Sequence, residues 1–427
     1  MKRQTNRHFR FDWTLILIYL ALVGFGWLNI FSASSTGAIT NYFDLTQPYG
    51  KQLLFIGLSL VLILLILAIE VKFYERFSSV IYIISILTLL GLFVFGKTVS
   101  GATSWYGIGS MTIQPSEFAK AATALAVAKF VSDLQTDIRT LRDQLKTFLI
   151  IGIPAFLILL QNDTGSTVVY TAFFFVLYRE GLPKVYLLIG LYLIIAAILT
   201  LKFGVLATSL LSIVLIVFTT LRFFKKQRFK GVFIPLLSIL MIGFSTTVDY
   251  VYKNKLPPHQ KDRISLWLRL EKDPEKLAQM RRTYAYNLLE SEKAISSGGF
   301  SGKGYLQGTR TTGKFVPEQH TDYIFSTVGE EWGFLGTAMV VILFIALLLR
   351  VIYLAEIQKN QFSRVYGYGV AAIIFIHFLI NIGMVMGLIP TIGIPLPFFS
   401  YGGSGLWGFT LLLFIFIKLD SNRINEW

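Results

Sequence analysis

The 427-residue chain contains no cysteine and only four histidines, His8, His259, His320 and His377. The lack of cysteine excludes disulfides, thiolate catalysis and cysteine-ligated metals. The histidines lie far apart in the sequence, which argues against a histidine-built metal site. The sequence identifies no cofactor, and it leaves open whether a divalent cation assists the protein.

Charged residues are also scarce. They make up 15% of the chain, against about 25% in soluble domains, whereas 54% of the residues are hydrophobic. This composition predicts an integral membrane protein. The 39 Lys and Arg residues outnumber the 24 Asp and Glu residues and give a formal net charge of +15. In a membrane protein such an excess is typical of loops that face anionic lipid, so we expect no nucleic-acid partner.

Long apolar runs predict an all-α polytopic membrane protein with about twelve transmembrane helices. The run near 13–33 follows a basic start and is too long for the core of a signal peptide, so we expect it to be retained. The other helices are expected near 51–70, 77–96, 116–131, 147–161, 165–179, 184–202, 204–221, 231–252, 326–352, 365–388 and 402–419.

A long polar segment separates two groups of apolar runs. It covers residues 253–322 and carries turn signals and aromatic residues that argue against simple disorder. The chain is therefore expected to divide into N-terminal transmembrane helices (1–252), a large extracytoplasmic loop (253–325) and C-terminal transmembrane helices (326–427).

The distribution of basic residues indicates the orientation. The loop at 221–230 (LRFFKKQRFK) holds five basic residues and no acid, whereas the loops at 34–50 and 390–403 hold no basic residue. Short cytoplasmic loops are enriched in Lys and Arg. We therefore expect 221–230 and both termini in the cytoplasm and the large loop outside.

Two motifs place charge near the ends of apolar helices. In GATSWYGIGSMTIQPSEFAKAATA (101–124), Glu117 and Lys120 are three residues apart, on one face of a helix that begins near Pro115. Charges inside a membrane helix are costly and indicate a functional site, although an ion pair at the interface is the simpler alternative. In LLQNDTGSTVVY (159–170), Asp163 follows a helix, where a capping role explains it equally well.

Two further motifs are rich in glycine. In residues 294–336, glycines and Lys303 suit a phosphate or diphosphate, although the spacing is not that of a P-loop. Titratable residues follow, and a solvated face with ordinary helix capping is the alternative for each of them: His320, Asp322, Glu330 and Glu331. The segment IPTIGIPLPFFSYGGSGLW (389–407) is broken backbone in apolar sequence, which predicts either a re-entrant wall of a substrate site or a tight outer turn.

Together these motifs resemble the SEDS family of polytopic glycosyltransferases, which includes RodA and FtsW. The motifs that carry the resemblance span 101–407 in family order: QPSEFAK, QNDTGS, SGGFSGKG, PEQHTDYIF, EEWGFLG and NIGMVMGLIPTIGIPLPFFSYGGSG. GIPLP looks more like the RodA, or elongation, branch. The resemblance implies a bacterial cell-membrane enzyme that polymerises lipid II into peptidoglycan strands. It also implies a class B penicillin-binding protein and the elongation machinery as partners.

The chain departs from the family pattern at several places. The family usually has ten helices, so an extra pair is expected within 184–252. Ser104 precedes Trp105, where Arg is common in the family, and Glu290 stands where Gln is usual. An insertion of EKLAQMRRTY makes the match across 275–290 loose.

The resemblance also implies site residues. An acceptor hydroxyl must be deprotonated by a base, and the loop alone offers four equal candidates: Asp262, Glu271, Asp273 and Glu275. For each of them, a solvated ion pair without a catalytic role is the alternative. Asp273, followed by Pro274, matches the family's catalytic Asp. The expected substrate-binding residues are Glu117, Lys120, Asp163, Arg263, Ser291, Lys303, His320, Asp322 and Ser400.

The sequence is also compatible with two other functions. A lipid II flippase would need a polar path with charges near the middle of the bilayer, whereas the motifs here cluster toward the outer face. A catalytically idle scaffold that recruits a synthase would tolerate substitution of single carboxylates.

The orientation can be tested by cysteine labelling, because the chain contains no cysteine of its own. Lys226→Cys should stay unlabelled by a membrane-impermeant reagent in intact cells, since its loop is expected in the cytoplasm. Labelling at position 226 in intact cells would show that the orientation is wrong.

Overall fold

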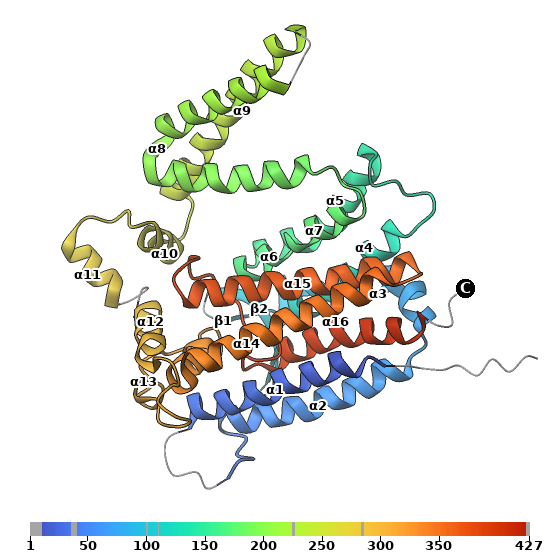
Figure 1. Ribbon diagram of the computed structural model, residues 1–427, viewed down its shortest axis with the longest axis vertical. Coiled ribbons are helices and arrows are strands. Elements are labelled where there is room, and N and C mark those ends of the chain that lie inside the picture. The colour runs from blue at the N-terminus through green and yellow to red at the C-terminus, as the bar shows by residue number, and fades with distance from the viewer. Residues whose placement is uncertain are drawn as a thin grey trace, which may run out of the picture. The chain divides into compact units, whose positions relative to one another are not determined.

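The computed structural model describes residues 11–35, 41–99, 101–109, 111–223, 227–282 and 286–423. Lys226 and both ends of the chain, which bear on the orientation, lie outside these ranges. The helices and strands occur in this order (Figure 1): α1 (Trp13–Ser34), α2 (Pro48–Ala68), α3 (Val71–Phe95), β1 (Lys97–Val99), β2 (Ala102–Ile108), β3 (Met111–Ile113), α4 (Pro115–Val131), α5 (Leu141–Leu160), α6 (Thr164–Val169), α7 (Ala172–Arg179), α8 (Val185–Phe223), α9 (Gln227–Asn254), α10 (Pro258–Leu268), α11 (Pro274–Arg282), α12 (Tyr286–Gly298), α13 (Thr309–Thr312), α14 (Ile324–Glu356), α15 (Gln361–Val385) and α16 (Gly403–Ser421).

The expected polytopic all-α architecture is confirmed. Nine helices in the described part of the chain are long and apolar enough to cross a membrane. The expected helices at 184–202 and 204–221 are joined in α8, which is interrupted at Gly204 (φ 86°). The expected helices at 116–131 and 165–179 are present as α4 and as α6 with α7, but these elements are shorter than a span.

The chain folds into two compact units, one formed by Met1–Leu182 with Asn287–Trp427 and the other by Pro183–Tyr286. These units cut across the divisions expected from the sequence, because the expected large loop (253–325) contributes to both. The second unit contains the α8–α9 hairpin, where Ala196, Ile216 and Met241 form a small core, together with α10 and α11.

In the first unit, α1, α2, α14, α15 and α16 run side by side (Figure 1). Helix α4 packs against α3, α5, α15 and α16, and its sequence is rich in buried alanine. Small side chains let membrane helices approach closely. Glu117 and Lys120 of α4 are therefore held in the interior of a tightly packed bundle.

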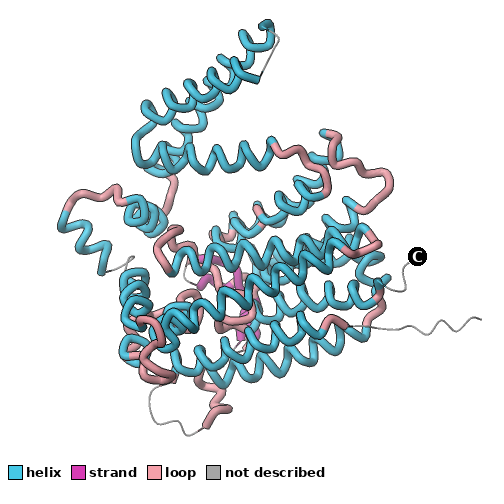
Figure 2. The backbone as a smooth tube through the Cα atoms, in the orientation of Figure 1, coloured by secondary structure: helices cyan, strands magenta, loops and turns pink. Residues whose placement is uncertain are grey.

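A small antiparallel sheet precedes α4. Its strands pair in the order β1-β2-β3, and Figure 2 shows them as the one patch of strand among the described helices. The amide of Thr103 on β2 donates to the carbonyl of Gln161, 3.0 Å away at the end of α5. The sheet is thus tied to the end of α5, and its last strand ends directly before Gln114, the N-cap residue of α4.

The glycine-rich segment after α12 packs against a break in α14. Gly333 has φ 61° and interrupts that helix, which leaves nearby carbonyls and amides without helical partners. The amides of Lys303 and Gly304 donate to the carbonyls of Glu330 and Glu331, each at 3.0 Å, and the amide of Phe334 donates to the carbonyl of Gly299 at 2.9 Å. The backbone of the glycine-rich segment is therefore engaged in hydrogen bonds with α14.

Candidate functional site

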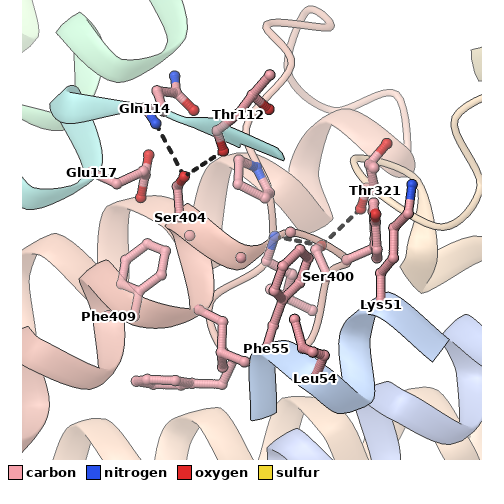
Figure 3. Close-up of a pocket in the computed structure, with 18 of the residues that line it drawn as sticks. Lys51, Leu54, Phe55, Thr112, Gln114, Glu117, Thr321, Ser400, Ser404 and Phe409 are labelled. Atoms are coloured by element: carbon pink, nitrogen blue, oxygen red, sulfur yellow. Dashed lines mark hydrogen bonds between the residues drawn. The ribbon is translucent and has the colours of Figure 1, made fainter. Parts of the chain in front are cut away.

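The first unit contains a cavity of about 300 Å³ where the starts of α2, α4 and α16 meet (Figure 3). Its polar lining includes Glu117 at the start of α4, Lys51 on α2 and Ser400 before α16. Apolar side chains line the rest, among them Leu54 and Phe55. A cavity with both apolar and polar walls suits a ligand that carries a lipid chain and a polar headgroup.

Beside this cavity, Glu117 and Lys120 form a buried ion pair, and Lys120 also contacts His377 of α15. The Nζ atom of Lys120 lies 2.8 Å from each carboxylate oxygen of Glu117 and 2.9 Å from Nε2 of His377. The exposed fractions of the three residues are 4%, 2% and 1%. The Lys120 ammonium also lies 4.9 Å from the centre of the Phe409 ring. The predicted pair therefore faces the protein interior rather than lipid.

The contacts of His377 fix which ring nitrogen carries the proton. Lysine has three donors and no acceptor, so Nε2 of His377 must accept from Lys120. The proton is then on Nδ1, which donates to the carbonyl of Pro395 at 3.3 Å. Pro395 lines the cavity. His377 thus connects the buried ion pair to the cavity wall through a neutral imidazole.

The broken segment before α16 forms that wall. Asn381 of α15 donates to the carbonyls of Asp322 and Ile394, at 2.8 and 2.7 Å. The hydroxyl of Ser400 donates to the carbonyl of Thr321 at 2.7 Å and accepts from the amide of Leu396 at 2.9 Å. Of the two interpretations of this segment, the structure matches the wall of a cavity.

Asp163 caps α6 and ties it to the start of α4. Its carboxylate accepts from the amide and hydroxyl of Ser166, at 2.9 and 2.8 Å, and from Nε2 of Gln114 at 2.9 Å. The capping role, which the sequence left as an alternative, is therefore present. Gln114 itself lines the cavity, so Asp163 acts on the cavity through a neighbour.

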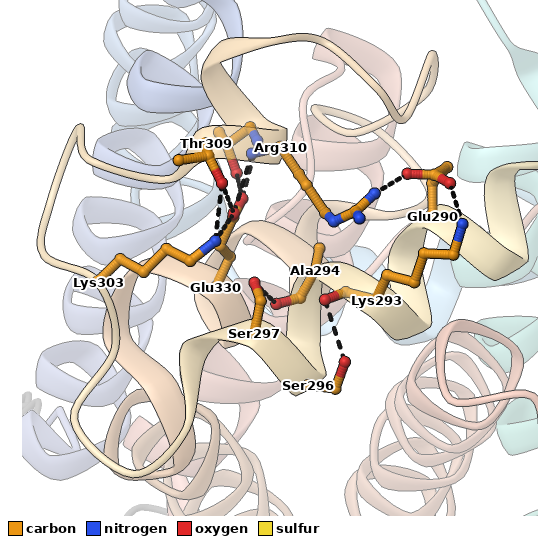
Figure 4. Close-up of polar contacts among 10 residues, drawn as sticks. Glu290, Lys293, Ala294, Ser296, Ser297, Lys303, Thr309, Arg310 and Glu330 are labelled. Atoms are coloured by element: carbon orange, nitrogen blue, oxygen red, sulfur yellow. Dashed lines mark hydrogen bonds and ion pairs between the residues drawn. The ribbon is translucent and has the colours of Figure 1, made fainter.

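Lys303 belongs to a second polar cluster, built around the fully buried Glu330 (Figure 4). Its ammonium lies 2.7 Å from the Glu330 carboxylate, which also accepts from the amides of Arg310 and Thr311, at 2.9 and 2.8 Å. Arg310 in turn contacts Glu290. Binding of a diphosphate by Lys303 stays a prediction, and it would require this ion pair to open.

The remaining predicted residues of the first unit have structural contacts of their own. Ser291 is buried and donates to the carbonyl of Val385 at 3.2 Å. The ring of His320 lies 5.4 Å from that of Tyr401, and burial lowers the pKa of His320, which favours the neutral imidazole. Asp322 lies beside Gly393. Their roles in substrate binding stay predictions.

Asp273 and Arg263 belong to the second unit. Arg263 lies in α10, and Asp273 precedes α11, where its exposed carboxylate accepts from the amide of Glu275 at 3.0 Å. Glu271, another candidate base, lies 2.7 Å from the ammonium of Lys276. That hydrogen bond lowers the pKa of Glu271, which makes it a weaker base than an ordinary glutamate.

Sequence reasoning missed two residues, Lys51 in the cavity lining and His377 beside it. His377 lies in the apolar run of α15, and an ionisable residue inside a membrane helix is itself a signal of function. Lys51 stands at the very start of an apolar run, where it looks like an ordinary helix-end cation. Neither residue is near Glu117 in sequence, so only the fold brings them together.

Comparison with known proteins places the chain in a family. The model of the FtsW, RodA and SpoVE proteins, described as "Cell cycle protein", matches residues 12–211 and 192–425. The chain belongs to this family. Peptidoglycan glycosyltransferase MrdB of Escherichia coli (strain K12) is 31% identical over 398 residues, covering 92% of this chain and 89% of the relative. Peptidoglycan glycosyltransferase RodA of Treponema pallidum (strain Nichols) is 30% identical over 442 residues, covering 97% and 98%.

Solved structures agree with this family assignment. A chain of a peptidoglycan synthase complex that coordinates polymerisation and crosslinking matches with a TM-score of 0.71 and 25% identity, covering 97% of this chain and 99% of that chain. Thermus thermophilus RodA shares the fold with a TM-score of 0.63 and 24% identity, covering 97% and 98%. The predicted SEDS resemblance is confirmed, as is the predicted class of multi-pass membrane peptidoglycan glycosyltransferase.

The buried ion pair gives a stability prediction. Glu117→Gln and Lys120→Met should each lower the free energy of unfolding by about 3–5 kcal/mol, because each leaves a buried charge without its partner. The double variant should lose less than the sum of the two losses, since neither charge remains. Denaturant unfolding of the purified protein in detergent measures all three.

A surface pair supplies the control for this cycle. Arg179 and Glu356 lie 2.6 Å apart, but their side chains are 52% and 42% exposed. Glu356→Gln should therefore cost no more than about 1 kcal/mol. If the two buried single variants prove as stable as this control, the buried pair does not have the structural importance assigned to it.

Proposed function

We propose that this protein polymerises lipid II into peptidoglycan glycan strands during cell elongation. The observation that carries the proposal is the match, over most of each chain, to two peptidoglycan glycosyltransferases at 31% and 30% identity. The cavity supports it, because lipid II combines an apolar polyprenyl chain with a polar diphosphate and sugars. In the reaction, the acceptor hydroxyl oxygen bonds to the anomeric carbon of the donor. The bond from that carbon to the diphosphate breaks, and polyprenyl diphosphate leaves.

Asp273 is the proposed general base for this reaction. The acceptor hydroxyl must lose its proton as it attacks, and an exposed carboxylate can take that proton. The side chain of Asp273 is oriented by its contact with the amide of Glu275. Glu271, by contrast, is engaged by Lys276. Asp273 is thus oriented and accessible, whereas the carboxylate of Glu271 is held in an ion pair.

The proposed setting is the bacterial cell membrane, with both termini in the cytoplasm and the segment 253–325 outside. A class B penicillin-binding protein is the proposed partner. This is supported by the similar chain from a complex that coordinates polymerisation and crosslinking. Transpeptidation by such a partner would consume the glycan strands that this protein makes.

A lipid II flippase is the second candidate. It is favoured by Glu117, Lys120 and His377, which are charged or ionisable residues buried inside the helix bundle, of the kind that transport pathways use. Against it, the two charges neutralise each other at 2.8 Å and are held by packed side chains. Two charges that are bound to each other in this way stabilise the fold, and they are not free to guide a lipid headgroup across the membrane.

Asp273→Asn tests the catalytic assignment. The variant keeps the shape of the side chain and removes its basicity, so polymerisation of lipid II should slow by about 100-fold or more while lipid II binding is retained. The measurement is glycan formation by purified variant with its partner.

Two neighbouring acids provide matched controls. Asp262→Asn and Glu275→Gln change charge in the same loop and should polymerise at close to the normal rate. A normal rate for Asp273→Asn with a slow rate for either control would move the base to that residue. Normal rates for all three would show that none of these three acids is the base, and Glu271→Gln would then test the remaining candidate of this loop.

A further inference from the structure

The cavity in the first unit carries a net positive charge. Lys51 and Glu117 are the charged side chains among its described lining residues. The carboxylate of Glu117 is neutralised by Lys120 at 2.8 Å. The ammonium of Lys51 forms no ion pair with any described residue. Figure 3 shows its side chain extending from α2 at the edge of the cavity, with no hydrogen bond to the residues drawn.

The surroundings of Lys51 add to this charge rather than balance it. Lys51 lies in the first turn of α2, and that turn contains no acidic residue. Because the N-terminus of a helix is partially positive, a cation there is unfavourable unless an anion is near. Gly403 and Gly405, in the first turn of α16, also line the cavity. The first amides of a helix have no acceptor within the helix.

Three other cations of the first unit are already paired with carboxylates. Lys303, which the sequence favoured, lies 2.7 Å from Glu330. Arg310 contacts Glu290, and Lys120 is held by Glu117. Lys51 differs from all of these because its charge is not offset by a carboxylate and because it faces a cavity large enough to admit a ligand.

We propose that Lys51 binds the diphosphate of the polyprenyl-linked substrate. The apolar neighbours of Lys51 in the cavity wall, Leu45, Leu54 and Phe55, suit the first part of the polyprenyl chain. The inference deepens the proposed function and rests on it for the identity of the lipid. The proposed anion site is at the start of α2, whereas the sequence favoured the glycine-rich segment between α12 and α13.

Steady-state polymerisation of lipid II tests the inference. A charge-assisted contact to diphosphate predicts that Lys51→Ala raises KM for lipid II by about 10- to 100-fold, with a smaller effect on kcat. Lys51→Arg keeps the charge and should restore KM to near the wild-type value. Lys97→Ala is the matched control, because Lys97 is exposed on β1 outside the cavity lining and this change removes the same charge.

Direct binding separates this inference from the proposed function. Wild-type protein in nanodiscs is titrated with polyprenyl diphosphate, with the polyprenyl alcohol, and with phosphatidylglycerol as an anionic membrane lipid. The inference predicts that polyprenyl diphosphate binds most tightly and that Lys51→Ala removes this preference, while its thermal unfolding stays like that of Lys97→Ala.

Each outcome of the two experiments decides a different point. Lys51-dependent binding of polyprenyl diphosphate by a protein that makes no glycan would refute the proposed function and keep the anion site. Equal binding of phosphatidylglycerol would overturn the assignment to a diphosphate. Unchanged KM and unchanged binding in Lys51→Ala would remove Lys51 from the site.

Discussion

Two opposite charges and an imidazole lie buried in the helix bundle, and the shape of the cavity depends on them. Glu117 and Lys120 are stable in this apolar setting only while their contacts of 2.8 Å are kept. This requirement holds α4 in place against α15, which supplies His377, and against α16. A Cβ atom at Gly408 of α16 would lie 2.9 Å from the carbonyl of Glu117, so that helix must approach without a side chain.

The same group determines how the cavity wall is held. His377 reaches the carbonyl of Pro395, while Asn381 and Ser400 secure the segment on either side of it. A broken backbone inside a membrane protein must have its polar groups satisfied by protein or by a polar cavity. Here side chains from α15 satisfy several of these polar groups, and the cavity lies beside the segment.

Local sequence patterns predicted the elements well, because hydrophobic periodicity and proline positions act over a few residues. Each expected apolar run is helical, and Pro115 begins α4 as expected. The spacing of Glu117 and Lys120 correctly placed both side chains on one face. The interruption at Gly204 lies where two helices were expected to meet, whereas the break between α6 and α7 was not expected, since tertiary packing rather than local propensity sets it.

The site was harder to predict, because its members meet only in the fold. The glycines near Lys303 looked like an anion site, but their amides complete the broken helix α14. Lys51 is 66 residues from Glu117 in the sequence and shares a cavity with it. A sequence shows that a charge is present, but its free or paired state depends on neighbours that are distant along the chain.

The central claim, that the protein is a lipid II polymerase, is tested most directly in proteoliposomes. Purified full-length protein is supplied with lipid II, with and without a class B penicillin-binding protein, and both glycan products and transbilayer movement of lipid II are measured. The account predicts glycan strands and released polyprenyl diphosphate, with more product when the partner is present. Movement of lipid II across the bilayer without any glycan would contradict it and would identify a flippase.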